Sequence, residues 1–295
     1  MSIVVPKYVN KLIQESLAIE AEHAKAAGKI GYMARALVQA TMPHKNPGLV
    51  PIWGRKNGNF SMVMQPGYAF GDSNEPINLG LPYGTKPRLV MAFLCSEAVK
   101  KGTKEIALGN SLSEFMEQLG LTPTGGRWGS IPLLKEQMKR LFSATVSFQY
   151  ENDQAQILGG FKIASQAVLL WSPNPEQAGL WDSTVTLTQE FYDEITGSAV
   201  PIDMRALSAL KSSCMALDIY CWLTYRMSYL KNPTEIPWEL LAAQFGSEYK
   251  NLRDFKLNFL KQLKKVTAVY PSVQIIDGEK GLLLKPSLTH ITKKS

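Results

Sequence analysis

The sequence has few of the residues that build catalytic and metal centres. Its three histidines, His23, His44 and His290, are far apart, and there is no H-x-H or H-E-x-x-H motif. A metal-dependent nuclease holds its ion with several such ligands, so no metal site is expected. The phosphate-binding motif G-x-x-x-x-G-K-[ST] and the nucleophile motif G-x-S-x-G are also absent. These absences predict a protein that is not an enzyme and needs no cofactor.

Cysteines and long apolar runs are scarce as well. Cys95, Cys214 and Cys221 form no C-x-x-C pair, and their odd number argues against a disulfide framework, so reduced thiols are expected. The N-terminus lacks the pattern of a signal peptide. The most apolar window, residues 214–225, is interrupted by Asp218 and is too short to span a bilayer. The sequence therefore predicts a cytoplasmic protein without membrane contact.

The positive charge is concentrated near the C-terminus. The chain has 295 residues, 45% of them apolar, which suits about two folded domains, and its net charge is +7. Residues 245–295 contain 10 Lys and Arg against 4 Asp and Glu, whereas residues 1–244 are almost neutral. Positive charge gathered on one element favours a nucleic-acid phosphate backbone as partner. The alternative is a solvated basic tail.

The first 84 residues are predicted to form an extension ahead of the domains. Residues 7–27 have the composition and spacing of an amphipathic helix. Residues 50–65 favour a β-hairpin, because Asn57 and Gly58 suit the positive φ angles of a tight turn. Residues 66–87 carry four prolines and four glycines, which is typical of a loop or linker.

Two later segments share one predicted order of elements, three helices followed by a β-hairpin, which is the order of a winged helix-turn-helix. In residues 85–198, helices are expected at 88–101, 111–119 and 130–142, with strands at 144–150 and 156–164. In residues 199–295, helices are expected at 204–227, 236–245 and 248–268, with strands at 273–276 and 282–285. The sequence thus predicts an α+β fold with two tandem winged helix-turn-helix domains behind an N-terminal helical and hairpin extension.

The basic helix at 248–268 is the main candidate for DNA contact. A core-facing stripe is predicted from the spacing of Leu252, Phe255, Phe259, Leu263 and Val266. The third helix of a winged helix enters the major groove N-terminus first, so its first residues are expected to reach base edges and its later lysines to hold phosphates. The predicted contact residues are Tyr249, Lys250, Arg253, Lys256, Lys261 and Lys264. Core packing, not base stacking, is expected of the aromatic residues Trp222, Tyr225, Trp238, Phe245, Phe255 and Phe259.

A glycine-rich stretch, residues 125–129, precedes the third helix of the first predicted domain. Glycines let the backbone approach a phosphate, and the helix N-terminus would offer free amides and a positive dipole end. Arg127 would then grip a phosphate or a base edge, and Trp128 would pack against a sugar. The alternative is a flexible turn with a buried tryptophan. The basic residues expected on the outward side of this helix are Lys135, Lys139 and Arg140.

Two long strings resemble the RepA-type plasmid replication initiators. One runs from Leu81 to Phe148 and contains LPYGTKPRLVMAFLCSEAVKKG and LTPTGGRWGSIPLLKEQMKRLFSATVSF; the other runs from Val200 to Ser287 and contains VPIDMRALSALKSS and FKLNFLKQLKKVTAVYP. The resemblance implies two winged-helix domains that bind repeated sequences (iterons) in double-stranded DNA at a plasmid origin. It also implies opening of adjacent AT-rich DNA and recruitment of the host initiator and replicative helicase. A monomer–dimer balance, in which dimers restrain replication, would control plasmid copy number in the bacterial cytoplasm.

Two other classes of function remain open from the residues alone. A transcription regulator can use the same two domains, because winged helices do not by themselves distinguish regulators from initiators. The other class is a nicking or priming enzyme, which the missing motifs disfavour.

Overall fold

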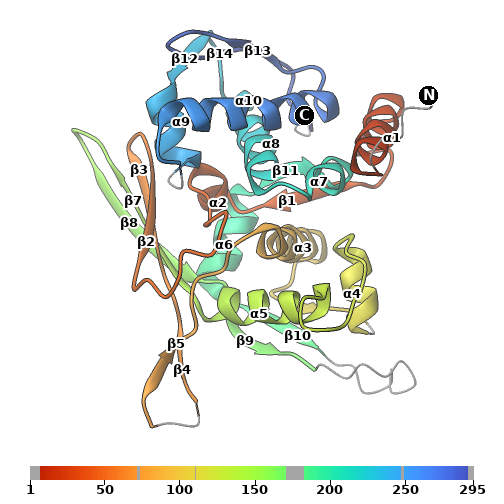
Figure 1. Cartoon of the computed structure of the whole chain (residues 1–295), viewed down its shortest axis with the longest axis vertical. Helices are drawn as coiled ribbons and strands as arrows, with labels where there is room; N and C mark the ends of the chain where they lie inside the picture. Colours follow the sequence, from red (N-terminus) through yellow and green to blue (C-terminus); the bar gives the residue numbers. More distant parts are fainter. Residues whose placement is uncertain (1–6, 72–73, 110, 171–182, 247–248, 292–295) are drawn as a thin grey trace. The chain divides into compact units, whose positions relative to one another are not determined.

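The computed structural model describes residues 7–71, 74–109, 111–170, 183–246 and 249–291 (Figure 1). The fold is mixed α+β with small sheets, which confirms the predicted class. The chain divides into two compact units. Unit 1 comprises residues 1–41, 55–58 and 200–295, and unit 2 comprises residues 42–54 and 59–199. These units combine distant segments, whereas the sequence predicted three consecutive stretches, 1–84, 85–198 and 199–295.

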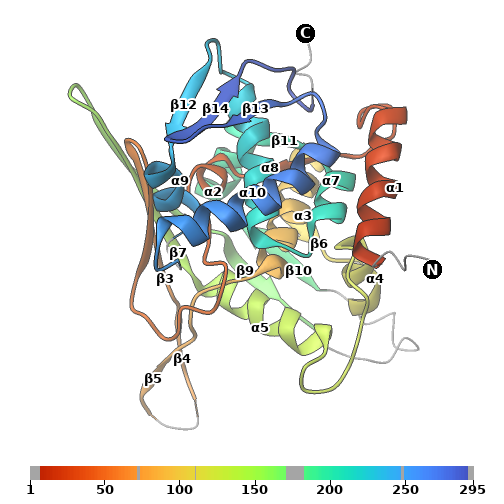
Figure 2. The same cartoon turned by 45° about the horizontal axis from the view of Figure 1, so that its top comes forward.

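Unit 1 joins the N-terminal helix to the last third of the chain. Its helices are α1 (Lys7–Ala21), α2 (Arg35–Gln39), α7 (Met204–Leu210), α8 (Cys214–Met227), α9 (Trp238–Phe245) and α10 (Leu252–Val269). Its strands are β1 (Ile30–Met33), β11 (Val200–Asp203), β12 (Thr234–Pro237), β13 (Gln274–Asp277) and β14 (Gly281–Lys285). The last three form an antiparallel sheet in the order β12–β14–β13. α10 packs on α8 (Figure 2).

The N-terminal helix belongs to the body of unit 1. β1 pairs antiparallel with β11, and α1 packs on α7 and α10. The Ser16 hydroxyl donates to the Ala268 carbonyl at 2.7 Å. Arg205 donates to the carbonyls of Ala18 and Glu22, each at 2.9 Å. These contacts differ from the N-terminal extension expected from the sequence, because amphipathic periodicity predicts a helix but not the surface on which it packs.

The core of unit 1 is an aromatic cluster. Phe259 lies at its centre, with ring centroids 5.6 Å from Phe245, 5.8 Å from Trp238 and 5.5 Å from Phe255. All four side chains are buried, as the sequence predicted. Gly246 ends α9, and a Cβ atom there would lie 2.4 Å from the Phe255 ring, so the close approach requires glycine.

The predicted helix at 204–227 is wrong in one respect, because it is two helices. α7 is capped by Asp203, whose side chain accepts from the Arg205 amide. α8 starts afresh after Ser213, whose hydroxyl accepts from the Ala216 amide at 3.3 Å. A side-chain cap satisfies the free amides of a new helix, so the chain turns at this point.

The end of the described chain is anchored in unit 1 by His290. Its Nδ1 lies 2.7 Å from the Tyr220 hydroxyl, and its ring stacks on Tyr270 with centroids 4.7 Å apart. The Tyr220 hydroxyl also accepts from the Asp203 amide at 2.8 Å. Burial lowers the pKa of His290 to about 4, so the neutral ring is the folded form near neutral pH.

Unit 2 contains the glycine-rich stretch and a longer set of strands. Its helices are α3 (Thr85–Lys101), α4 (Leu112–Gln118), α5 (Ser130–Ser143) and α6 (Gln189–Ser198). Its strands are β3 (Phe60–Gln65), β4 (Tyr68–Phe70), β5 (Pro76–Asn78), β6 (Glu105–Ala107), β7 (Thr145–Glu151), β8 (Gln156–Lys162), β9 (Ala164–Val168) and β10 (Thr184–Leu187). α4 begins at a side-chain cap, since the Ser111 hydroxyl accepts from the Glu114 amide at 3.1 Å.

The region between residues 50 and 87 is more structured than expected. The strand β2 (Trp53–Asn57) and β3 flank a turn, as predicted, but of the two turn residues named for it only Gly58 has a positive φ. The stretch predicted as a linker contains the short antiparallel pair β4–β5. Arg88, in the first turns of α3, is buried and donates to the carbonyls of Met42 and Pro43 at 2.7 and 3.2 Å.

The hairpin at 145–162 is not the wing that the sequence predicted. β7 pairs with β3 on one side and with β8 on the other, so this hairpin belongs to a separate sheet. The strand after α3, β6, instead pairs with β10, and β10 pairs with β9. The strands themselves lie where they were expected, but strand partners are set by tertiary packing and cannot be read from local alternation.

Both units repeat one order of elements: helix, strand, helix, helix, strand, strand. In unit 1 these are α8, β12, α9, α10, β13 and β14, and in unit 2 they are α3, β6, α4, α5, β9 and β10. The sheet orders also correspond, β12–β14–β13 and β6–β10–β9, with the last strand between the other two. In unit 2 the β7–β8 hairpin is inserted between the third helix and the next strand. None of the described helices is long and apolar enough to cross a membrane.

Candidate nucleic-acid interface

The start of α10 is fixed by a side-chain cap. Asn251 accepts from the Asp254 amide at 2.8 Å, and its amide group donates to the Asp254 carboxylate at 2.9 Å. The helix therefore begins at Leu252 and not at residue 248, which lies outside the described residues. Tyr249 and Lys250 consequently precede the helix and occupy the segment that leads into it.

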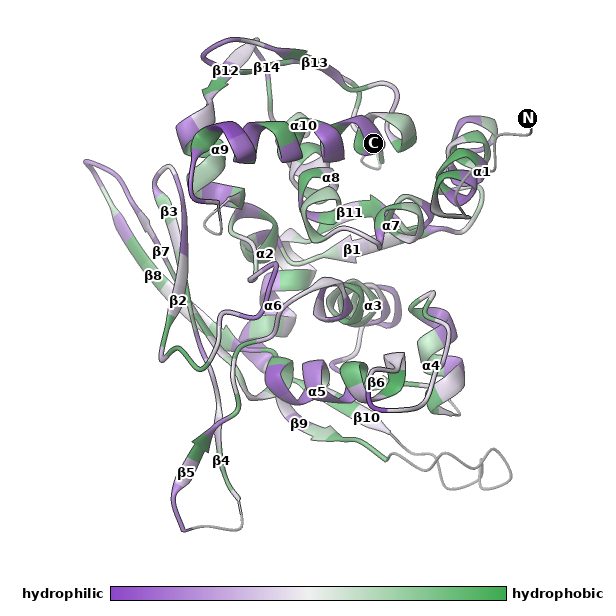
Figure 3. Cartoon of the chain, in the orientation of Figure 1, coloured by the Kyte–Doolittle hydropathy of each residue, from purple (hydrophilic) through white to green (hydrophobic). Residues whose placement is uncertain are grey.

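α10 has a buried face and an exposed basic face. Hydrophobic and hydrophilic residues follow one another along it (Figure 3). Phe255, Phe259, Leu263 and Val266 are buried, as their spacing predicted, but Leu252 is 37% exposed and does not belong to the core. The basic residues on the exposed side are Lys250, Arg253, Lys261 and Lys264. Close to them, partial burial lowers the pKa of Lys265, and the charge of Lys261 lowers it further. Four cations thus lie exposed on or beside one helix, so this face favours a negatively charged partner.

Lys256 has contacts within the protein that the sequence did not suggest. Its ammonium donates to the Gly278 carbonyl at 3.0 Å and lies 3.0 Å from the Asp277 carboxylate. It also sits 4.6 Å from the centre of the Trp238 ring, a cation–π contact. Lys256 therefore ties the turn between β13 and β14 to α10. Its predicted DNA contact is untested, but its charge already has partners in unit 1.

Tyr249 is half-buried beside α10. Its hydroxyl is hydrogen-bonded to the Asn258 side-chain amide, which donates to it. Its ring meets the Phe255 ring edge-on, with centroids 5.8 Å apart. These contacts fix the segment before the helix. The base contact predicted for Tyr249 stays a prediction.

The glycine-rich stretch of unit 2 is an ordered loop that caps α5. The Thr124 hydroxyl accepts from the Ser130 amide at 2.8 Å, and the Ser130 hydroxyl accepts from the Thr124 amide at 2.9 Å. The Thr124 carbonyl accepts from the Ile131 amide at 3.2 Å. Gly129 packs so closely that a Cβ atom would lie 2.2 Å from the carbonyl oxygens of Thr124 and Gly125. The first amides of α5 are therefore occupied, and the expectation that they would be free for a phosphate is wrong.

Arg127 and Trp128 project from this loop. Trp128 is 79% exposed, so the alternative of a buried tryptophan is wrong. The Arg127 guanidinium lies 5.2 Å from the centre of the Trp128 ring, and Arg127 is exposed. The loop thus presents a stacked cation and indole to solvent, a pair that can meet a phosphate with one group and a sugar or base with the other.

α5 presents fewer cations than expected. Lys139 is exposed and Lys135 is half-buried. Arg140, predicted to point outward, has a side chain only 13% exposed and donates to the Glu136 carboxylate at 2.8 Å. It also lies over the Tyr83 ring, with its guanidinium carbon 5.3 Å from the ring centre. The outward placement expected for Arg140 is wrong, because the guanidinium is turned toward the segment before α3.

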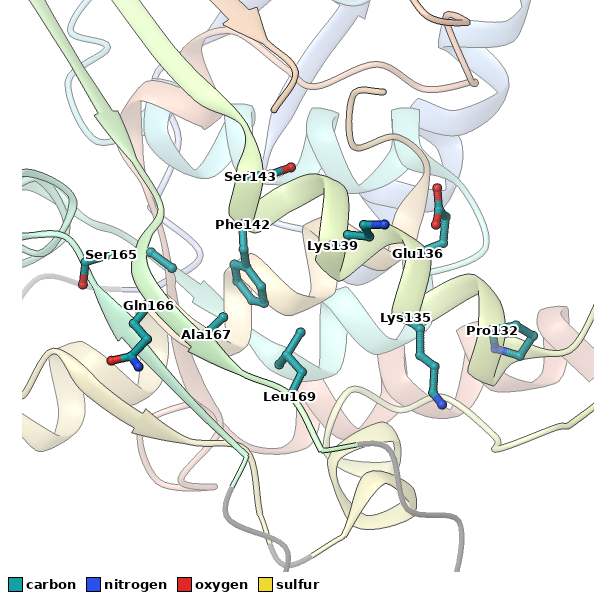
Figure 4. A pocket seen from close by; sticks show the side chains of 11 residues that line it. Pro132, Lys135, Glu136, Lys139, Phe142, Ser143, Ser165, Gln166, Ala167 and Leu169 are labelled. Carbon is teal, nitrogen blue, oxygen red and sulfur yellow. The ribbon is translucent and has the colours of Figure 1, made fainter. Parts of the chain in front are cut away.

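Lys135 and Lys139 line a groove between α5 and β9 (Figure 4). Its volume is about 520 Å³, and Phe142, Ala167 and Leu169 form its apolar floor. This groove was not predicted from the sequence, because strands were not expected at β9 and β10. Within the described part of the chain, no three His, Cys, Asp or Glu side chains come together as a metal site requires.

The architecture is that of a mixed α+β protein with two units of like topology, and it occurs in a protein of known structure. The chain is similar to the crystal structure of RctB domains 2–3, with a TM-score of 0.50 and 9% identity over 85% of this chain and 96% of that one. A selenomethionine form of RctB domains 2 and 3 matches with a TM-score of 0.52 and 8% identity, over 85% and 98% of the two chains. At this identity the likeness concerns the fold alone.

The family is established by sequence. The family model described as plasmid-encoded RepA protein matches residues 81–239, more than half of the chain. The chain therefore belongs to the RepA family of plasmid replication initiators, as the resemblance of its two strings had indicated. No curated protein matches the sequence.

Proposed function

We propose that each unit contains a winged helix-turn-helix domain and that the protein binds double-stranded DNA at a plasmid origin. The repeated order of helix, strand, helix, helix, strand and strand supports the assignment in both units. In this arrangement α10 and α5 are the third helices, and β13–β14 and β9–β10 are the wings. Family membership supports the origin as the target.

The observation that carries the proposal is the exposed basic face of α10. The third helix of a winged helix enters the major groove with its N-terminal residues toward the bases. Arg253 lies in the first turn of α10 and is assigned a guanine edge, to which arginine binds through two hydrogen bonds. Lys261 and Lys264 lie two and three turns further on and are assigned to phosphates. Lys250, just before the helix, is assigned a base edge.

Unit 2 supplies supporting contacts. Lys135 and Lys139 on α5 are assigned to phosphates beside the groove that they line. Arg127 and Trp128 reach the adjacent backbone from the loop before α5. Because the amides of α5 are occupied by Thr124, these contacts come from side chains and not from the helix end.

The wider role proposed for the chain is that of a non-catalytic initiator. Through iterons at the origin it opens adjacent AT-rich DNA and recruits the host initiator and replicative helicase in the bacterial cytoplasm. Dimers restrain this activity and limit plasmid copy number. Membership of the RepA family supports this role.

The binding proposal is tested with the full chain and two duplexes, one carrying the repeats that flank its own gene and one with the same bases scrambled. Replacing both Lys261 and Lys264 with alanine should weaken binding to both duplexes and reduce the dependence of affinity on salt. The matched control replaces Lys25 and Lys231, which are also exposed in unit 1 but are not part of α10. It removes the same charge and should leave affinity nearly unchanged. Equal losses from both double variants would contradict a specific role for α10.

The initiator role is tested in cells. A plasmid that carries the origin but not the gene should replicate only when the protein is supplied separately. Repression of a promoter without such replication would indicate a transcription regulator instead. Strand cleavage by the purified chain with a divalent metal would contradict the non-catalytic role.

A further inference from the structure

An exposed leucine lies in the middle of the basic face of α10. Leu257 is 61% exposed, and it follows Arg253 and precedes Lys261 by four residues each. At about 100° per residue, the side chains of Arg253, Leu257, Lys261 and Lys264 leave the helix within a sector of about 80°. Leu257 and Lys264 are near the middle of this sector. The apolar side chain therefore has Arg253 and Lys261 one turn away on either side, with the exposed Asp254 three residues before it, on the face assigned to DNA.

Core packing does not account for this leucine. The core contacts of α10 are made by Phe255, Phe259, Leu263 and Val266, which are buried on the other side of the helix. Helix propensity does not require it either, since lysine, glutamate or glutamine serves a helix about as well and is better solvated. An apolar residue at this position is available to contact an apolar group that a partner brings to the same face.

We propose that Leu257 is a specificity-determining residue that recognises the C5 methyl group of thymine in the major groove. This inference rests on the proposed binding of α10 to DNA. The thymine methyl is the apolar group on the major-groove edges of the four bases, and apolar side chains are its usual contacts. Leu257 lies about 6 Å along the helix from Arg253, and base pairs are stacked about 3.4 Å apart. The thymine is thus expected one or two base pairs from the guanine that Arg253 contacts.

The test removes the methyl group from the DNA and the side chain from the protein in turn. Each thymidine of the repeat is replaced singly by 2′-deoxyuridine, which lacks only the C5 methyl group. Affinity of the full chain is measured for each duplex, with the wild type, with Leu257→Ala and with the control Leu288→Ala. Leu288 is 76% exposed in the same unit but lies outside α10. Alanine keeps α10 helical, so folding is preserved.

The expected result is a loss of about fourfold at one position of the repeat, the value for removing one buried methyl group. The Leu288→Ala variant should show the same loss at that position. In Leu257→Ala, binding of the thymidine duplex should fall, and deoxyuridine at that position should cause no further loss.

Three results would overturn the inference while leaving DNA binding intact. One is that the wild type binds every deoxyuridine duplex as tightly as the thymidine duplex. Another is a deoxyuridine loss of equal size in the wild type and in Leu257→Ala, which would assign the methyl contact to another side chain. The third is a normal affinity of Leu257→Ala together with failed self-association, which would assign the leucine to a protein partner instead. Absence of specific binding by the wild type would refute the proposed function itself.

Discussion

Replacing Lys256 with alanine should destabilise unit 1 without changing the number of phosphates that the protein neutralises. The Lys256 ammonium has three partners within the unit, the Gly278 carbonyl, the Asp277 carboxylate and the Trp238 ring. Lys261 lies five residues later on the same helix and is exposed. The two lysines therefore allow the structural and the DNA-binding roles of α10 to be measured apart.

The size of the stability effect follows from the three contacts. A hydrogen bond from a charged donor contributes about 1.5–3 kcal/mol when well formed. The ion pair with Asp277 is partly exposed, since the two side chains are 29% and 48% accessible, and such pairs contribute about 0–1 kcal/mol. The cation–π contact adds about 0.5–1 kcal/mol. Because the contacts share one ammonium and are not additive, about 2 kcal/mol is expected for Lys256→Ala.

The assay pairs chemical unfolding with DNA titration over a range of salt concentrations. Lys256→Ala should lower the free energy of unfolding by about 2 kcal/mol. It should leave the slope of log affinity against log salt unchanged. Lys261→Ala should leave unfolding within about 0.5 kcal/mol of the wild type, as for an exposed substitution. It should reduce the salt slope by about 0.9, the contribution of one phosphate. A normal stability with a reduced salt slope for Lys256→Ala would show that this lysine binds DNA and would refute its assignment to the turn.

Three further predictions follow from single side chains. Arg253→Ala should cost about 1–3 kcal/mol on the origin repeat and little on scrambled DNA in parallel titrations, and an equal loss on both would contradict base recognition. Gly129→Ala should lower the melting temperature, because its Cβ atom would lie 2.2 Å from the carbonyl oxygens of Thr124 and Gly125; an unchanged temperature would contradict the packing of the loop. Since the pKa of His290 is lowered to about 4 from 6.5, the unfolded chain binds the additional proton between these values, and the free energy of unfolding should fall by up to about 3 kcal/mol as the pH is lowered through this window. In His290→Gln that part of the pH dependence should disappear, and an unchanged curve would contradict it.

The elements that the sequence predicts well are those whose signals are local. The buried stripe of α10 from Phe255 to Val266 follows from spacing within a few residues, and it is present. The break between α7 and α8 escaped prediction, although Lys211, Ser212 and Ser213 interrupt the apolar pattern there and Ser213 caps the new helix.

Strand partners and charge partners escaped prediction for a different reason. β7 alternates as a wing strand would, yet it pairs with β3, far away in the sequence. Likewise, Lys256 and Arg140 look like members of basic helix faces, but the first is held by the β13–β14 turn and the second by Glu136 and Tyr83. A cation is available to a ligand only where the fold leaves it without a closer partner, and the fold is not visible in helical spacing. The exposed cations of α10 could be predicted from helical spacing, whereas the internal partners of Lys256 and Arg140 could not.

The two units therefore share one topology, but the third helices, α10 and α5, differ in how many cations they leave exposed. On α10 the Lys256 ammonium holds the turn between β13 and β14, and four other cations remain exposed in or beside the helix. On α5 Arg140 is used to hold the segment before α3, which leaves Lys135 and Lys139 beside the groove.

Long-range attraction to phosphates scales with the number of accessible charges, and base recognition requires donors at the start of the helix. Unit 1 has both the accessible charges and, in Lys250 and Arg253, donors at the start of its helix. Unit 2 has fewer accessible charges on α5 and presents Arg127 and Trp128 from the loop that caps this helix. We therefore expect unit 1 to supply most of the affinity and base recognition and unit 2 to extend the contact along the DNA backbone.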